Sequence, residues 1–134
     1  MKIVIDTNVV ISGVFFGGAP RRVLEAVTDK NVEAYATAQI VEEYCEVIDE
    51  MIGRRQGALS SSVLTPFISR LHFIDSTSSI KASRDPDDDK FIECAVDSGA
   101  LYIVSGDKDL LVLKSYEGIE MITAADFCRR FLDE

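Results

Sequence analysis

Apolar and polar residues follow one another along this chain in short blocks that predict strands and helices in alternation. Apolar or alternating runs of strand length predict strands at residues 2–6, 32–37, 71–75, 100–105 and 119–123. The remaining apolar residues recur at helical spacing, which predicts helices at residues 21–28, 38–52, a stretch ending near 70, 86–98, a short stretch within 106–113, and 124–132. Residues 53–60 and 76–83 show neither pattern and are predicted as a break and a loop.

Turn and capping residues support several of these helix boundaries. Pro20 ends the turn sequence GGAP and is well placed in the first turn of the helix that follows. Thr37 immediately precedes a long helical pattern and is its expected N-cap. Pro86 suits a first helical position, which makes Asp85 the expected N-cap of the next helix.

The order of the predicted elements sets the fold class. Strands that alternate with helices predict an α/β fold, in which helices cover both faces of a mostly parallel sheet. No repeat, linker or low-complexity tract interrupts the 134 residues, so we expect a single domain over residues 1–134.

The opening segment MKIVIDTNVVISGVFF has the Lys and the apolar stretch of a signal peptide, but we interpret it as a buried strand. Asp6 and Asn8 interrupt its apolar run, and no clean cleavage pattern follows. No apolar run approaches the roughly 20 residues of a membrane span. The three cysteines are dispersed without metal-ligand spacing, which indicates reduced thiols. We therefore expect a cytoplasmic protein with no membrane association.

Charge gives two opposing indications. The net charge of -9 argues against a generic nucleic-acid-binding surface, which is normally basic. However, the segment SRDPDDDKFIECA at 83–95 places four aspartates within residues 85–89, where an apolar helix begins. One or two carboxylates would suffice to complement the positive end of a helix dipole. Four suggest a divalent cation, which would reverse the local field.

Helix geometry distinguishes the inward-facing acids from the others. In the helix after Pro86, Asp88 lies near the middle of the apolar face, whereas Asp87 and Asp89 flank it at about 100° to either side. In the helix at 38–52, Glu43 borders the buried stripe. Its neighbours Glu42 and Glu46 are expected to face water.

Two further acids follow predicted strands. Asp6 ends the first strand, and Asp107 follows the strand at 100–105. The carboxyl ends of parallel strands meet at one edge of the sheet, where the ligand sites of α/β folds lie. We therefore expect Asp6, Glu43, Asp88 and Asp107 to converge. Four carboxylates cannot all remain ionised in a desolvated cleft, but Mg²⁺ or Mn²⁺, which prefer oxygen ligands, would relieve their repulsion.

Four segments together resemble a known family: IDTNVVIS, VEEYCEVI, DPDDDKFIECA and YIVSGDKDLL. In this order and spacing they are similar to the PIN-domain ribonucleases, in particular the toxin-like members of prokaryotic toxin–antitoxin systems. The resemblance implies a Rossmann-like three-layer α/β/α sandwich and hydrolysis of RNA phosphodiester bonds with Mg²⁺ or Mn²⁺. It also implies a homodimer and inhibition by a cognate antitoxin. The implied catalytic and metal-binding residues are Asp6, Glu43, Asp88 and Asp107, supported by Thr7, Asn8, Ser105 and Asp109.

Two alternatives remain open at this stage. A haloacid-dehalogenase-like phosphatase also has an Asp after its first strand, but the patterns of that family fail here at Asn8 and Leu111. A receiver-like signalling module would bind Mg²⁺ and accept phosphate on Asp6, but it usually needs a Lys after a later strand.

The single histidine, His72, is expected to pack or to face solvent. The arginine pairs at 21–22 and 54–55 could contact RNA phosphate or solvate helix faces.

Overall fold

The computed structural model describes residues 1–55 and 61–133 and contains a six-stranded sheet in the order β3-β2-β1-β4-β6-β5. The strands are β1 (Lys2–Ile5), β2 (Glu33–Ala36), β3 (His72–Phe73), β4 (Tyr102–Val104), β5 (Ser115–Tyr116) and β6 (Ile119–Ile122). Neighbouring strands pair in parallel, except that β5 is antiparallel to β6. The predicted α/β class with a mostly parallel sheet is confirmed.

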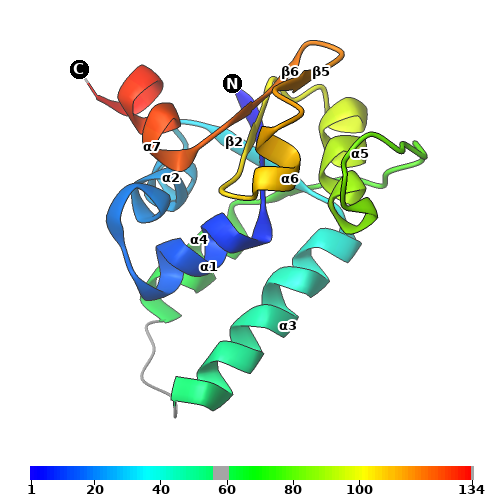
Figure 1. Ribbon diagram of the computed structural model, residues 1–134. Coiled ribbons are helices and arrows are strands. Elements are labelled where there is room, and N and C mark those ends of the chain that lie inside the picture. Colours follow the sequence, from blue (N-terminus) through cyan, green and yellow to red (C-terminus); the bar gives the residue numbers. More distant parts are fainter. Residues whose placement is uncertain (56–60, 134) are drawn as a thin grey trace.

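Helices connect the strands and cover the sheet (Figure 1). They are α1 (Thr7–Phe15), α2 (Gly18–Thr28), α3 (Ala38–Arg55), α4 (Ser61–Ser69), the 3₁₀ turn η1 (Pro86–Asp88), α5 (Asp89–Ser98), α6 (Lys108–Leu111), α7 (Ala124–Phe127) and the π-helical turn η2 (Cys128–Leu132). Helices α2 and α7 lie on one side of the sheet and α5 lies on the other, which gives a Rossmann-like sandwich. Among the described residues, no helix is both long and apolar enough to cross a bilayer.

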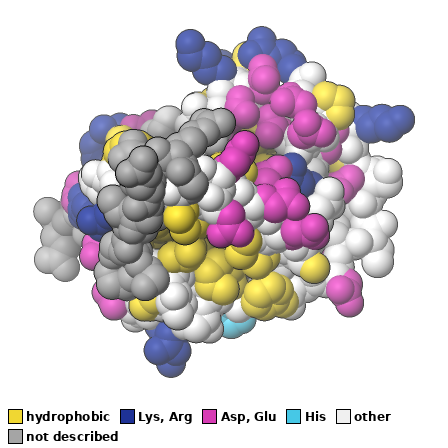
Figure 2. Space-filling view, turned by 90° about the horizontal axis from the view of Figure 1, so that it is seen from below, with side chains coloured by type: hydrophobic (Ala, Val, Ile, Leu, Met, Phe, Trp, Pro, Cys, Tyr) yellow, Lys and Arg dark blue, Asp and Glu magenta, His cyan; other side chains and the backbone are white. Residues whose placement is uncertain are grey.

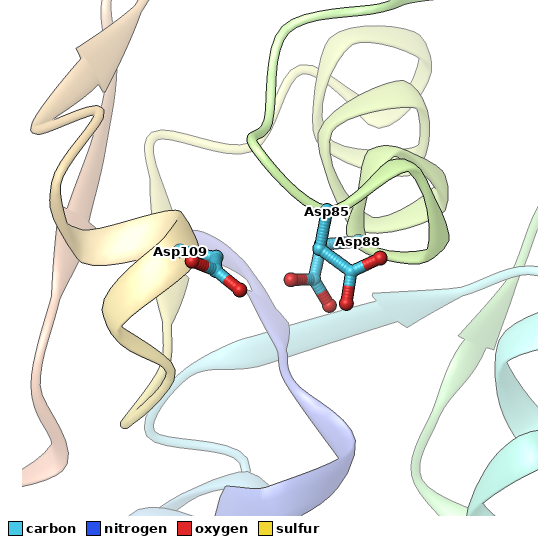
Figure 3. Close-up of side chains that lie close together, drawn as sticks. All are labelled: Asp85, Asp88 and Asp109. Carbon is cyan, nitrogen blue, oxygen red and sulfur yellow. The ribbon is translucent and has the colours of Figure 1, made fainter.

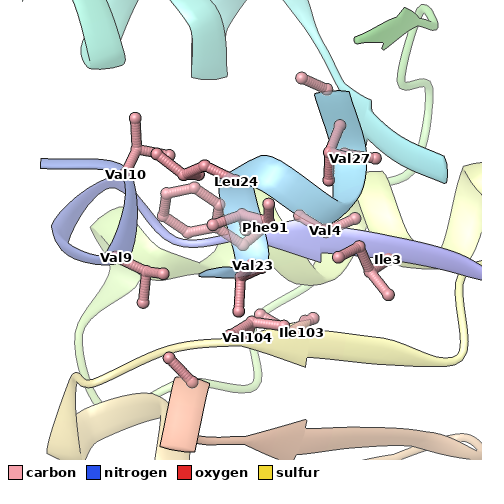
Figure 4. Close-up of a cluster of buried hydrophobic side chains, with 14 of the residues drawn as sticks. Ile3, Val4, Val9, Val10, Val23, Leu24, Val27, Phe91, Ile103 and Val104 are labelled. Atoms are coloured by element: carbon pink, nitrogen blue, oxygen red, sulfur yellow. The ribbon is translucent and has the colours of Figure 1, made fainter. Parts of the chain in front are cut away.

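The apolar runs of the sequence form the centre of this sandwich (Figure 4). Ile3, Val4 and Ile5 of β1 are almost completely buried, as a central parallel strand with both faces covered requires. Leu24 of α2 and Phe91 of α5 are also buried in this core. The central strand β1 is therefore held firmly, and its carboxyl end fixes the position of Asp6.

Two capping predictions are confirmed, and both concern helices that reach the carboxyl edge of the sheet. The Thr37 hydroxyl oxygen accepts a hydrogen bond from the Ile40 amide at 3.2 Å, at the start of α3. An Asp85 carboxylate oxygen accepts one from the Asp87 amide at 3.0 Å, at the start of η1. Helix α3 runs to Arg55, so the predicted break at 53–60 begins too early; from 56 to 60 it lies outside the described residues.

The interpretation of the opening segment as strand is wrong beyond β1, because residues 7–15 form helix α1. This segment is rich in β-branched residues, which favour strands in isolation. Its apolar residues are nevertheless stable in a helix, because α2 and α3 pack against it and cover most of its surface.

Helix α2 begins at Gly18, three residues before the predicted start at residue 21. Its Arg21 side chain donates hydrogen bonds to the carbonyl oxygens of Gly13 and Val14 in α1, at 2.8 and 2.9 Å.

Strand β5 was also not predicted. It forms a two-residue hairpin arm joined to β6 by Glu117 and Gly118, both of which have positive φ angles. That pair of conformations is the type I′ hairpin turn. The sequence Glu-Gly lacks the Asn or Asp that usually marks such a turn, so its signal in the sequence is weak.

Candidate metal centre

The carboxyl ends of β1 and β4 bring two acids to the same edge of the sheet. The strands pair in parallel with Ile5 opposite Val104, and Asp6 follows β1 directly. Ser105 links Asp6 to Asp107: its hydroxyl donates to Asp6 Oδ2 at 2.6 Å and accepts from the Asp107 amide at 2.9 Å. Ser105 is fully buried, so one neutral side chain fixes both acids at the site.

Asp6 is a buried carboxylate with an unfavourable electrostatic environment. Its side chain lies at the end of the central strand, and only 3% of the residue is exposed. Burial raises the pKa of Asp6, and the negative charges of Asp107 and Glu43 raise it further, against the lowering effect of the Ser105 hydrogen bond. A positive charge placed among these groups would stabilise the ionised form of Asp6.

Asp88 reaches the same region from the turn η1. It is 7% exposed, and its Oδ2 atom is buried without a hydrogen-bond partner among the described residues. Burial raises the pKa of Asp88 to about 7, with further contributions from the charges of Asp107 and Asp6 and from a hydrogen bond to Asp107. A buried polar atom without a protein partner is normally satisfied by an ordered water, an ion or a ligand.

Glu43 lies at the border of the site, on α3. It is half-buried while Glu42 is exposed, which agrees with the helix phase predicted from the sequence. The Thr7 hydroxyl donates to one Glu43 carboxylate oxygen, and the Lys90 ammonium lies 2.8 Å from the other. Sequence reasoning missed Lys90, because helix phase places a lysine but does not reveal which acid it will meet.

A second group of acids adjoins the first and shares Asp88. One carboxylate oxygen each from Asp85, Asp88 and Asp109 lies within 4.8 Å of the others (Figure 3). Asp107 caps helix α6, because its Oδ1 accepts a hydrogen bond from the Asp109 amide at 2.8 Å. The Asp109 Oδ1 atom accepts a hydrogen bond from Arg84 Nη2 at 2.8 Å. Asp109 was predicted as a supporting residue, and Asp85 only as a helix cap.

The predicted supporting residues Thr7 and Asn8 follow Asp6 in helix α1. Thr7 is buried and contacts Glu43, as described above. The Asn8 side chain is exposed, whereas its backbone amide lowers the pKa of Asp6 through a hydrogen bond.

The predicted surface or packing role of His72 is consistent with its position: its ring stacks on that of Tyr35, with ring centroids 4.8 Å apart.

Asp89, which helix phase places beside the apolar face and not on it, is nevertheless buried. It is 7% exposed, and its Oδ1 accepts from the backbone amides of Ala82 and Ser83 at 3.1 and 2.8 Å. One and two turns further along α5, Glu93 accepts from the Ile80 amide, and Asp97 accepts from the segment 76–78. These three acids, four residues apart, hold the loop at 76–83 against the helix. That spacing was the signal in the sequence for their role.

The whole acidic group lies at the edge of the sheet toward which β1 runs. Figure 2 views the molecule from that side and shows Asp and Glu side chains gathered on it, beside an apolar patch. Apart from the cations of Lys90 and Arg84, the polar side chains described above at this site offer carboxylate or hydroxyl oxygens, which suit Mg²⁺ or Mn²⁺ better than a soft metal. The residues thus fit a hard divalent cation at the usual ligand edge of an α/β sheet.

Comparison with known proteins gives one family and one relative. The PIN domain family matches residues 2–109, a range that contains all four predicted carboxylates. An uncharacterized protein of Methanocaldococcus jannaschii is 32% identical over 120 residues, which cover 85% of this chain and 76% of that protein. No solved structure matches the chain.

Proposed function

This chain belongs to the PIN domain family, and we propose on that basis that it is a metal-dependent endoribonuclease. Members of this family are generally nucleases. We propose Mg²⁺ or Mn²⁺ as the cofactor, RNA as the substrate, and hydrolysis of phosphodiester bonds as the reaction. The observation that carries this proposal is the buried, unpaired Oδ2 of Asp88, an acid whose pKa is raised by its burial and by the negative charges of Asp107 and Asp6.

In this proposal Asp6, Asp88 and Asp107 would hold the cation, with Glu43 beside them. A divalent cation bound there would lower the pKa of an attacking water and stabilise charge on the phosphodiester. Ser105 keeps Asp6 and Asp107 in place through its two hydrogen bonds. Because the Ser105 hydroxyl adds no charge, the negative charge available to the cation is retained.

The cellular role is proposed from the resemblance of the motifs to toxin-like PIN proteins. We infer the toxin component of a toxin–antitoxin pair, acting in the cytoplasm as a homodimer that a cognate antitoxin inhibits. No contact among the described residues bears on these partners, so the inference depends on the resemblance alone. Co-purification of the tagged chain with the product of a neighbouring reading frame would test it.

The enzymatic proposal is tested by incubating the protein separately with labelled RNA and with acetyl phosphate, each with Mn²⁺ and with EDTA. We expect RNA cleavage only with Mn²⁺, and no phosphorylated protein. Asp6→Asn should reduce cleavage by at least about 100-fold, because the amide keeps the shape and loses the ligand charge. Glu46→Gln, on the exposed side of α3, is the matched control and should cleave normally. Cleavage that survives EDTA, or stable phosphorylation of Asp6, would refute the proposal.

A further inference from the structure

We propose that a cavity at the start of β2 and β3, here called the basic cavity, binds single-stranded RNA away from the carboxylates of the metal centre. The cavity has a volume of about 490 Å³, and its walls come from the end of α2, the start of β2, the end of α4 and β3. Asp6 and Asp107, in contrast, follow the ends of β1 and β4. The proposal rests on RNA as the substrate in the proposed function and adds a second place at which the chain holds it.

An acidic chain that binds RNA needs basic side chains that its own acids do not occupy. The net charge is -9, and the acids of the metal centre repel a polyanion when no cation is bound. The arginine pair at 21–22, a candidate phosphate contact from the sequence, is engaged elsewhere. Arg21 donates to carbonyl oxygens of α1, and Arg22 forms an ion pair with Asp133. The side chains of the pair at 54–55 lie outside the described part of the chain.

The basic cavity contains two such cations. Lys30 follows α2 and Arg70 follows α4; both line the cavity, both are exposed, and neither forms an ion pair with any described residue. Glu33, the one acid among the described lining residues, accepts a hydrogen bond from the Tyr35 hydroxyl at 3.1 Å. Lysine and arginine side chains bind phosphate oxygens, and the planar arginine group does so through two parallel donors.

Two stacked rings border the cavity and offer a surface for a nucleobase. His72 lines the cavity and is exposed, and its ring lies 4.8 Å from that of Tyr35 at an interplanar angle of 18°. The two residues are partners in the parallel pairing of β2 with β3, so both side chains lie on the same face of the sheet. Lys2 Nζ lies 5.2 Å from the centroid of the Tyr35 ring and adds a third positive charge there. Single-stranded nucleic acid binds to this combination, because its bases stack on rings while cations follow its phosphates.

The same features favour RNA over an acidic peptide. The buried side chains of Val27 and Leu71 also line the cavity, so it offers apolar surface to a sugar or a base as well as cations to a phosphate. An acidic peptide would use the cations but not the exposed ring stack. A duplex would keep its bases stacked within itself, so the strand that uses the rings is a single one.

The test is the binding of a fluorescein-labelled oligouridine, measured by fluorescence anisotropy in EDTA over a series of salt concentrations. EDTA prevents cleavage and leaves the metal centre without a cation, so RNA does not bind to its acids. Lys30→Gln/Arg70→Gln should weaken binding by about tenfold or more at low salt. It should also reduce the slope of log affinity against log salt by about 1.4, since each lost phosphate contact contributes about 0.7. His72→Ala should weaken binding by at least about fivefold without changing this slope.

The matched control is Lys81→Gln/Lys114→Gln, which removes the same charge from exposed side chains elsewhere on the surface. It should keep the wild-type slope and bind within about threefold of the wild type, because charges beyond the Debye length are screened. A control as weak as the Lys30→Gln/Arg70→Gln variant would overturn the proposal, as would wild-type binding in that variant or in His72→Ala. Competition by polyglutamate as effective as that by unlabelled oligouridine would also overturn it, in favour of an acidic peptide.

The binding assay and the cleavage assay fail separately. A wild type that does not bind oligouridine in EDTA but cleaves RNA with Mn²⁺ would refute the basic cavity as an RNA site and leave the proposed function standing. A wild type that binds oligouridine with the expected effects of the variants, but does not cleave RNA with Mn²⁺, would refute the proposed function and leave the RNA site standing.

Discussion

Asp88→Asn is expected to stabilise the metal-free protein at neutral pH, although it removes the acid most central to the site. Asp88 is 7% exposed, and its surroundings raise its pKa from the ordinary value of 3.8 to about 7. The folded state therefore binds the proton more tightly than the unfolded state does. Ionisation of Asp88 lowers stability progressively as the pH rises from about 4 to about 7, and the loss is constant above that range.

The size of the effect follows from the pKa difference. Each pKa unit corresponds to about 1.4 kcal/mol, so the full difference sets an upper limit of about 4 kcal/mol. Local relaxation and entry of solvent reduce this figure, and we expect about 1–2 kcal/mol. In a domain of this size that corresponds to several degrees in melting temperature, at about 2–8 °C per kcal/mol.

The assay is thermal unfolding in EDTA at a series of pH values between 4 and 8, at constant ionic strength. Asp88→Asn should match the wild type near pH 4 and melt at a higher temperature at pH 8. Asp89→Asn is the matched control, since it is equally buried but accepts two backbone hydrogen bonds, and it should destabilise the fold. If Asp88→Asn is instead destabilising at pH 8, or if its effect does not depend on pH, the described environment of Asp88 is wrong.

Three further predictions concern other parts of the molecule. Glu43→Gln leaves Lys90 without its counter-ion and should reduce RNA cleavage by about 10- to 100-fold, whereas Glu42→Gln should match the wild type in the same assay. Ser105→Ala removes the link between Asp6 and Asp107 and should reduce cleavage by about tenfold or more, with recovery in Ser105→Thr; an unaffected alanine variant would exclude this role. Gly13→Ala should cost about 1–3 kcal/mol in urea unfolding, because an added Cβ would lie 2.6 Å from a Leu24 methyl carbon; wild-type stability would contradict this packing.

Sequence reasoning succeeded where a local signal and the tertiary structure agree. The apolar run before Asp6 is a strand because a central parallel strand is buried on both faces, and this pattern is readable directly. The inward orientation of Asp88 followed from the apolar period of the helix that begins beside it. The structure confirms the burial of this residue, while its role as a metal ligand stays a prediction.

The failures occurred where contacts distant in sequence determine the outcome. Helix α1 has the composition of a strand, and only its burial against α2 and α3 makes the helical form favourable. Helix phase placed Asp89 beside the apolar face but did not reveal its burial, because helix phase describes the helix surface and not the loop that covers it. The pairing of Lys90 with Glu43 joins α5 to α3, and neither sequence pattern contains that contact.

The central claim, that the group around Asp88 binds a divalent cation, is tested most directly by the effect of Mn²⁺ on the melting temperature. Wild type and Asp88→Asn should be melted in rising Mn²⁺ at fixed ionic strength, with Na⁺ substituted as the control for screening. An ion that binds only the folded state stabilises it by about 2.7 kcal/mol at 100 times its dissociation constant. We therefore predict a rise of several degrees in the wild type and a much smaller one in Asp88→Asn. Equal melting temperatures of the wild type with and without Mn²⁺ would contradict the account.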